Sequence, residues 1–427
     1  MGDGKDVAKR SLLGTGGVPL GRDMKIILLT LVLANIGTSI DQRFAPLYIT
    51  DLGASPTEIG LVFTIVGLFV TVLSPIGGWA VDRYRRVTLY ALGPMIGTVG
   101  ALLILLGPTW GWVVPGYVIS SLPGLLVGPA LFGLVSDLGP EETRGSRFAL
   151  QAVAGGICGA IGPILGGYIY QYLGYRAFLV GQAGMLVLAG LIRTKVRDPR
   201  EARRRETGYH PPSLILGLRQ AVGQMAASPR FRAFFVMVVL FQFAASAVGS
   251  LTSVFMREVV GVNEAQMGIL FTLAGVASIV GGLAGGVASD RIGKRPVFAM
   301  AIFGFSLGMA CLIAARSMAA LMLVFIFQGL ATNLASPVFQ SYFAEVTDTE
   351  NRGTSFSVFN SLLTLMFLPA PLVGGLIWDN VGPIALIWFS VILSAAGGVV
   401  ALAWLKEKRR PPGADRNVVG EAKTLAP

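Results

Sequence analysis

Apolar residues fill this chain in long runs that short polar segments separate, and twelve of these runs are long enough to cross a lipid bilayer. A bilayer core of about 30 Å requires about 20 residues of helix per crossing. Because lipid offers the backbone no hydrogen-bond partner, each run is predicted to be a helix. The predicted spans are residues 25–50, 58–82, 87–107, 112–136, 147–171, 176–193, 231–257, 265–289, 296–315, 318–344, 354–378 and 383–405. The pattern therefore predicts an all-α membrane protein with twelve transmembrane helices.

The composition agrees with this prediction. Hydrophobic residues make up 53% of the chain and charged residues 13%, whereas a soluble domain carries about 25% charged residues. The net charge of +11 does not indicate nucleic-acid binding, because the basic residues form short tracts without interleaved aromatic residues. Cys158 and Cys311 lie in apolar runs without metal-ligand spacing, so they are predicted to be packing residues. We expect no metal and no cofactor.

The basic residues orient the spans. Of the 34 Lys and Arg residues, all but Arg43, Arg176, Arg257 and Arg316 lie in the tails or in alternate loops. The positive-inside rule then places both termini in the cytoplasm, and we expect the spans to lie in the plasma membrane. The polar loop 194–230 is long enough to join two bundles. The predicted parts are a tail (1–24), a six-helix bundle (25–193), a cytoplasmic linker (194–230), a second six-helix bundle (231–405) and a tail (406–427).

A short motif occurs twice, 208 residues apart. Its copies are Gly78-Trp-Ala-Val-Asp82-Arg83-Tyr-Arg85-Arg86 and Gly286-Val-Ala-Ser-Asp290-Arg291-Ile-Gly293-Lys294-Arg295. In the same register, Glu142-Thr-Arg144 aligns with Glu350-Asn-Arg352, and Gly162-Pro163-Ile-Leu-Gly166-Gly167 aligns with Ala370-Pro371-Leu-Val-Gly374-Gly375. Several motifs in one ungapped register indicate a duplicated unit. Because each unit has an even number of spans, both copies insert with the same orientation, which is a parallel repeat.

These motifs resemble those of the major facilitator superfamily of transporters, whose signature between spans two and three is Gly-x-x-x-Asp-Arg-x-Gly-Arg-Arg. The second copy fits apart from Lys/Arg exchange, and the first departs at Arg85 and Val87. The resemblance implies two bundles that rock in alternating access, with a latch between them at the cytoplasmic side. Alternatively, these charges only set the topology. The residues implied in the latch are Gly78, Asp82, Arg83, Arg86, Gly286, Asp290, Arg291, Gly293, Lys294, Glu142, Arg144, Glu350 and Arg352.

The tract Gly162-Pro163-Ile-Leu-Gly166-Gly167 in span five resembles a motif that this superfamily associates with antiporters. Two flanking glycines of that motif are Cys158 and Ala149 here. Span eleven carries nearly the same tract with Pro371, Gly374 and Gly375, and close helix packing favours small residues. Export and plain helix packing both explain the tract.

Span one carries two charges, Asp41 and Arg43, which the repeat replaces with Gly249 and Leu251. A charge inside a span costs at least about 2.5 kcal/mol, so it indicates a partner or a function. At 100° per residue the two side chains lie on different faces of the helix. We predict that Asp41 binds a proton or another coupling cation and that Arg43 contacts substrate or a counter-ion. The alternative is that they form ion pairs with other helices.

Polar residues of several spans face the predicted seam between the bundles. With the span-one charges, the candidates for substrate or proton coupling are Asn35, Asp41, Arg43, Gln242, Ser246, Gln328, Asn333 and Asn360. No nucleophile with a base and no phosphate-binding loop is found, so an enzyme is not predicted. The leading function is proton-coupled efflux of a small amphipathic or drug-like molecule by a monomeric transporter. The alternatives are uptake of a small polar metabolite by symport or facilitated diffusion and, more remotely, a non-transporting membrane sensor.

Overall fold

The computed structural model describes residues 21–138, 143–197, 223, 228–347 and 352–405, and these residues form helices without strands. Twelve stretches among them are long and apolar enough to span a membrane, which confirms the predicted number. The first bundle contains α2 (Arg22–Asp51), α3 (Pro56–Arg83), α4 (Arg86–Leu106), α5 (Trp110–Asp137), α6 (Arg144–Leu173) and α7 (Tyr175–Arg193). The second contains α9 (Pro229–Gly249), α10 (Thr252–Phe255), the π-helical turn η3 (Met256–Val260), α11 (Glu264–Ile292), α12 (Lys294–Ala314), α13 (Met318–Leu334), α14 (Ser336–Val346), α15 (Arg352–Phe367), α16 (Ala370–Asn380) and α17 (Pro383–Trp404).

Three spans of the second bundle are interrupted where the sequence predicted continuous helices. Span seven ends at Gly249 and continues as α10 and η3, span ten breaks between α13 and α14, and span eleven breaks between α15 and α16. Pro337 and Pro371 lie in the first turns of α14 and α16, where a proline needs no hydrogen-bonded amide. The equivalent Pro129 and Pro163 of the first bundle lie inside the unbroken helices α5 and α6. The bundles therefore share a fold but not the same helix continuity.

The duplication is visible in the backbone. A shift of 208 residues carries α4 onto α12 from end to end. It also carries Gly53 onto Gly261 and Gly174 onto Gly382, and all four have positive φ. The motif copies differ because Gly293, with φ +92°, joins α11 directly to α12, whereas Arg85 has φ −63° in a turn that Tyr84 lengthens. An extended turn does not require the left-handed region, so it accommodates Arg85 in place of glycine.

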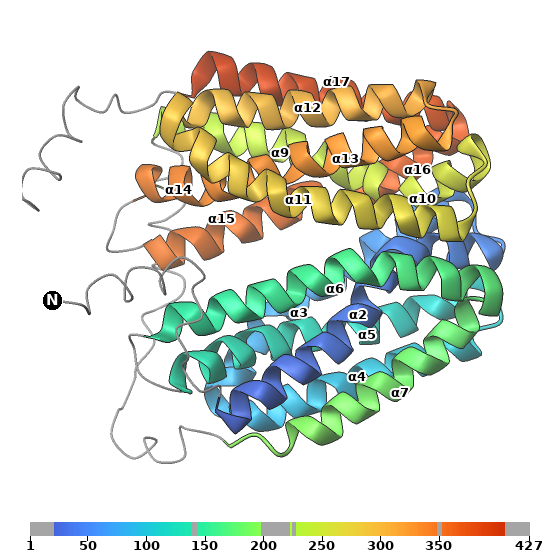
Figure 1. Ribbon diagram of the computed structural model, residues 1–427, viewed down its shortest axis with the longest axis vertical. Coiled ribbons are helices and arrows are strands. Elements are labelled where there is room, and N and C mark those ends of the chain that lie inside the picture. Colours follow the sequence, from blue (N-terminus) through green and yellow to red (C-terminus); the bar gives the residue numbers. More distant parts are fainter. Residues whose placement is uncertain (1–20, 139–142, 198–222, 224–227, 348–351, 406–427) are drawn as a thin grey trace, which may run out of the picture.

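The bundles meet at one end of the molecule. We call the end where α2 begins and α17 ends the terminal end, and the opposite end the distal end. One core cluster joins both bundles at the distal end, from Phe44 and Tyr175 of the first to Phe271 and Trp378 of the second. At the terminal end each bundle has a separate core. Figure 1 shows the bundles converging at the distal end and diverging toward the terminal end.

Glycines make the close contacts between the bundles. Ideal Cβ atoms on Gly167 and Gly375 would lie 2.3 Å from the carbonyl oxygens of Glu264 and Pro56, across the seam. A Cβ on Gly60 would lie 2.2 Å from the Pro371 oxygen. The adjacent Gly166 and Gly374 pack inside their own bundles, against Ile40 and Ala247, and Gly162 packs against Ser39. Both tracts thus combine one glycine that faces inward with one that faces the opposite bundle.

Substitution of Gly167 by alanine is expected to open the distal end. Its Cβ would meet backbone atoms of α11, which cannot rotate away as a side chain can. The state that is closed at the distal end is therefore destabilised by about 1–3 kcal/mol. Cysteine accessibility at the distal end measures this opening. Gly159→Ala on the same helix is the matched control, because its Cβ meets nothing within 4 Å. Equal accessibility in both variants would contradict the packing role.

Candidate functional site

Asp41 of α2 points into the first bundle. The hydroxyl of Tyr175, the first residue of α7, donates a hydrogen bond to Asp41 Oδ1. Gly174, with φ +80°, makes the turn between α6 and α7, so the rings of Tyr170 and Tyr175 lie side by side with centroids 5.3 Å apart. Within the described part of the chain, Asp41 forms no ion pair. Its carboxyl therefore has a neutral donor beside it and no fixed counter-charge.

The tyrosine that binds this carboxyl, Tyr175, belongs to a cluster with Tyr170, Tyr48 and Tyr117. Tyr48 stacks on Tyr175 at 4.6 Å, and Tyr117 of α5 belongs to the same buried cluster. The Tyr48 hydroxyl is buried and forms no hydrogen bond to any described residue, and the buried Tyr117 hydroxyl lies beside that of Tyr175. An unpaired buried polar group costs about 1–3 kcal/mol, and such groups are typical of functional sites. The sequence did not single out these tyrosines, because aromatic residues occur in most of its spans.

Arg43 points the opposite way, across the seam. Its guanidinium carbon lies 4.9 Å from the centre of the Phe271 ring of α11, a cation–π distance. Arg43 lines a cavity of about 240 Å³ whose other walls belong to the second bundle, among them Phe305, Phe325 and Gln328. It is the only charged residue among those that line this cavity. The two charges of α2 thus contact different bundles. They lie on different faces of the helix, as its period predicted.

A second cavity, of about 320 Å³, adjoins the first at Thr332. Gln242 and Asn360 line it together with Phe241 and Phe339. Asn360 Nδ2 donates to the carbonyl of Phe356, one turn earlier in its own helix. Gln242, Gln328 and Asn360 are therefore brought to the two cavities, as candidates for substrate contact.

Three other candidates lie elsewhere. Asn333 Nδ2 donates to the Ser278 carbonyl at 3.0 Å, a contact that ties α13 to α11. Asn35 and Ser246 are half-buried and line neither cavity. The structure therefore does not bring these three residues together with Arg43.

An ion-pair cluster joins the bundles at the distal end. Arg257 Nη1 of η3 lies 2.9 Å from Asp51 Oδ1 of α2 and 3.7 Å from Glu264 Oε1 of α11. The Tyr170 hydroxyl donates to Asp51 as well. Burial alone would lower the pKa of Arg257, but Asp51, Tyr170 and Glu264 together raise this pKa above its ordinary value. We call Arg257, Asp51, Glu264 and Tyr170 the distal clasp.

Two reciprocal caps reinforce the distal clasp. The Thr57 amide at the start of α3 donates to Asp379 Oδ2 of α16 at 2.9 Å. The Ala265 amide at the start of α11 donates to Gln171 Oε1 of α6 at 3.1 Å. Each bundle thus caps a helix N-terminus of the other, where unpaired amides favour an acceptor. The 208-residue repeat relates the two hydrogen bonds, so either one predicts the other.

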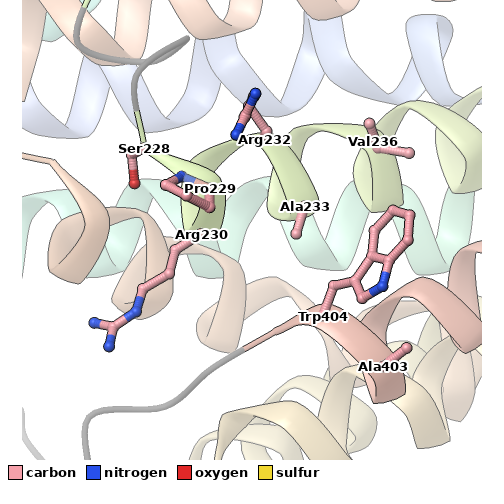
Figure 2. A pocket seen from close by; sticks show the side chains of 8 residues that line it. All are labelled: Ser228, Pro229, Arg230, Arg232, Ala233, Val236, Ala403 and Trp404. Carbon is pink, nitrogen blue, oxygen red and sulfur yellow. The ribbon is translucent and has the colours of Figure 1, made fainter.

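A larger hollow of about 660 Å³ lies at the terminal end of α9 and α17. Figure 2 shows its lining, which includes Arg230, Arg232 and Trp404 and belongs wholly to the second bundle. It receives no residue from α2 and none of the predicted coupling residues. The cavity that Arg43 lines and the cavity that adjoins it at Thr332 contain predicted coupling residues, so these two, and not this hollow, form the candidate site.

The model of the Major Facilitator Superfamily matches residues 27–263 and, again, residues 234–427. The two matches together cover both bundles. The chain belongs to the major facilitator superfamily. Members of this family are transporters rather than enzymes, so this protein is a multi-pass membrane transporter with a small-molecule substrate.

Curated relatives of this transporter are similar over nearly their whole length. Quinolone resistance protein NorA of Staphylococcus aureus is 20% identical over 391 residues, which are 90% of this chain and 96% of the relative. Multidrug resistance protein MdtG of Salmonella paratyphi A is 24% identical over 412 residues, 91% of this chain and 96% of the relative.

Solved structures agree on the fold. A bacterial homologue of the human lysosomal transporter Spinster, in an inward-facing conformation, superposes with a TM-score of 0.70 at 16% identity and covers 91% of this chain and 98% of its own. The nucleoside transporter NupG has a TM-score of 0.72 at 14% identity, with 91% and 100% coverage. Identities this low show the shared architecture alone.

The implied latch residues of the transporter are only partly described. Glu142 and Glu350, the surroundings of Gly78, and the side chains of Asp82 and Arg352 lie outside the described part of the structure. Among described residues, Asp290 and Arg291 are exposed and form no ion pair with each other or with a neighbour. Gly286 is half-buried, Gly293 forms the turn described above, and Arg83 and Arg144 are exposed at the terminal end.

Arg86 and Lys294 of the implied latch have partners within their own bundles. Arg86 pairs with Asp137 of α5 at 2.7 Å, and Lys294 pairs with Glu345 of α14 at 2.7 Å. Gly133 leaves room for the Arg86 guanidinium, since a Cβ there would lie 2.2 Å from Arg86 Cζ. The sequence reading missed both carboxylates, although Asp137 and Glu345 also lie 208 residues apart. These two pairs are the clearest polar trace of the duplication.

Proposed function

We propose that this transporter exports a small amphipathic molecule in exchange for protons. The terminal end faces the cytoplasm, the spans lie in the plasma membrane, and a single chain suffices. Asp41 is the proton-binding group. The cavity that Arg43 lines, which we call the cavity under Arg43, receives the substrate. In this conformation the distal side is closed, and substrate enters from the terminal side.

One observation carries the proposal: two charges that the duplication does not share lie two residues apart and face different bundles. Asp41 contacts Tyr175 of the first bundle, and Arg43 contacts Phe271 of the second. A movement of one bundle against the other must act on the helix that carries both charges. Protonation of Asp41 can therefore bias the two states that differ in access to the cavity, which is the thermodynamic requirement for coupling.

Three further findings support export of an amphipathic molecule. The cavity walls are mainly apolar and aromatic, which suits a substrate with an apolar body. The distal clasp and the reciprocal caps close the side that we assign to the outside. The similar proteins NorA and MdtG are named for quinolone and multidrug resistance.

Proteoliposomes with an imposed pH gradient test the proposal. Exchange with protons predicts that an acidic lumen accumulates norfloxacin, an amphipathic carboxylate, above the level in protein-free liposomes, which controls for trapping of weak bases. Symport predicts accumulation only with an alkaline lumen, and facilitated diffusion predicts equilibration that ignores the gradient. Accumulation with the alkaline lumen, or no flux of any compound, would overturn the proposal.

A further inference from the structure

We infer that the cavity under Arg43 selects amphipathic organic anions, with a carboxylate held by Arg43 and Gln328 and an apolar body against the aromatic wall. The inference rests on the proposed function, because it assigns the substrate class to the same cavity. It assigns opposite signs to the two sites on α2: a cation-binding carboxyl in the first bundle and an anion-binding guanidinium at the second.

The Arg43 side chain presents a charge that the protein does not neutralise. The side chain is exposed to the cavity, its one recorded contact within the described residues is the face of Phe271, and no carboxylate lines the cavity. An arginine inside a membrane protein pairs with an acid or a backbone carbonyl or faces a water-filled cavity, and such residues mark substrate and ion pathways. A guanidinium also presents parallel donors that match both oxygens of a carboxylate. The missing counter-charge is therefore best supplied by the ligand.

Gln328 is the second observation that points to a ligand. Both polar atoms of its amide are buried, and neither forms a hydrogen bond to any described residue. Gly308 of α12 gives this amide its room, since an ideal Cβ there would lie 1.9 Å from Gln328 Oε1. A buried amide without partners costs about 1–3 kcal/mol. Gln328 also lines the cavity, so a rotation of its side chain away from Gly308 would let Nε2 donate to a carboxylate there and recover part of that cost.

The walls specify the rest of the ligand. Phe271, Phe305, Phe325 and Met309 give the cavity aromatic and thioether surfaces, which favour an apolar or aromatic body. The adjoining cavity beyond Thr332 continues this surface with Phe241 and Phe339. A lipophilic cation finds no acidic partner here, because Asp41 points to Tyr175 in the opposite bundle. The cavity therefore selects among ligands more by the charge of the ligand headgroup than by the shape of the ligand's apolar body.

A set of three matched probes tests the inference on the purified full-length protein. The probes are 4-phenylbutyrate, 4-phenylbutanamide and 4-phenylbutylamine, which share one body and carry negative, neutral and positive headgroups. Isothermal titration at neutral pH is expected to show at least tenfold tighter binding of the carboxylate than of either analogue. Arg43→Gln should erase this preference, whereas Arg176→Gln, which changes an exposed arginine outside the cavity, should retain it.

Gln328→Leu separates recognition from folding. Because it removes a buried amide that lacks partners, this variant is expected to unfold at a higher temperature than the wild type while binding 4-phenylbutyrate at least threefold more weakly. Gly308→Ala should weaken binding as well, by displacing Gln328. A carboxylate preference that survives Arg43→Gln would overturn the inference, as would equal binding of the three probes or no binding of the carboxylate.

The inference and the proposed function can fail separately. Proton-driven accumulation of ethidium without any binding of 4-phenylbutyrate would sustain proton-coupled export and overturn the anion assignment. Carboxylate binding that depends on Arg43, in a protein that moves no compound against a pH gradient, would sustain the anion site and overturn the proposed function.

Discussion

Replacement of Asp41 by asparagine is expected to abolish proton-driven accumulation of substrate. A gradient of two pH units supplies about 2.7 kcal/mol per proton, enough for about 100-fold accumulation when one proton is exchanged per substrate. Asparagine retains the size and the ability to accept from the Tyr175 hydroxyl, but it binds no proton, so the accumulation ratio should fall to about one. Flux into proteoliposomes at a clamped membrane potential measures the ratio.

Substrate exchange at equal pH separates coupling from folding in this experiment. Asp41→Asn should retain exchange, because the cavity under Arg43 lies on the other face of α2. Tyr172→Phe is the matched control for the tyrosine cluster, since Tyr172 is an exposed residue of α6 outside it. It should accumulate substrate as the wild type does. Wild-type accumulation by Asp41→Asn would contradict the assignment of the proton site.

The fold could be predicted because its signals are long and repeated. Each span carries enough apolar residues to be recognised alone, and the 208-residue register relates the two bundles independently of hydropathy. The breaks at Gly249, between α13 and α14 and between α15 and α16 could not be predicted in the same way. Pro129 and Pro163 remain inside unbroken helices, whereas their counterparts Pro337 and Pro371 begin new ones, so packing decides the outcome.

The candidate site was predictable only in part. Asp41 and Arg43 stand out because the repeat does not copy them, and their opposite directions follow from the helical period. Their partners do not follow, because Tyr175 and Phe271 come from helices whose rotation is set by tertiary packing. The Arg257–Asp51 pair was missed for a different reason. Asp51 and Arg257 are not related by the register, so comparison of the two halves cannot reveal their pairing.

The distal clasp gives the second large effect that we expect: Arg257→Ala should shift the transporter toward a state that is open at the distal end. The substitution removes the ion pairs to Asp51 and Glu264 and leaves these two carboxylates near one another without a counter-charge. The pair is partly exposed, with 25% of the Arg257 and 44% of the Asp51 side chain accessible, so solvent weakens it. A loss of about 1.4 kcal/mol corresponds to a tenfold change in the ratio of the two states.

Spin labels at residues 173 and 381 report this ratio, because Leu173 and Val381 are exposed at the distal ends of opposite bundles. The labelled protein must first lose Cys158 and Cys311. Arg257→Ala should increase the population of molecules with the longer distance between the two labels. Arg257→Lys should increase it less, because lysine retains the charge. Arg316→Gln is the matched control, since Arg316 contacts only the neighbouring Ala315 carbonyl among described residues. If Arg257→Ala and Arg316→Gln gave the same distances, the ion pairs would not hold the distal side closed, and the glycine contacts and reciprocal caps would suffice.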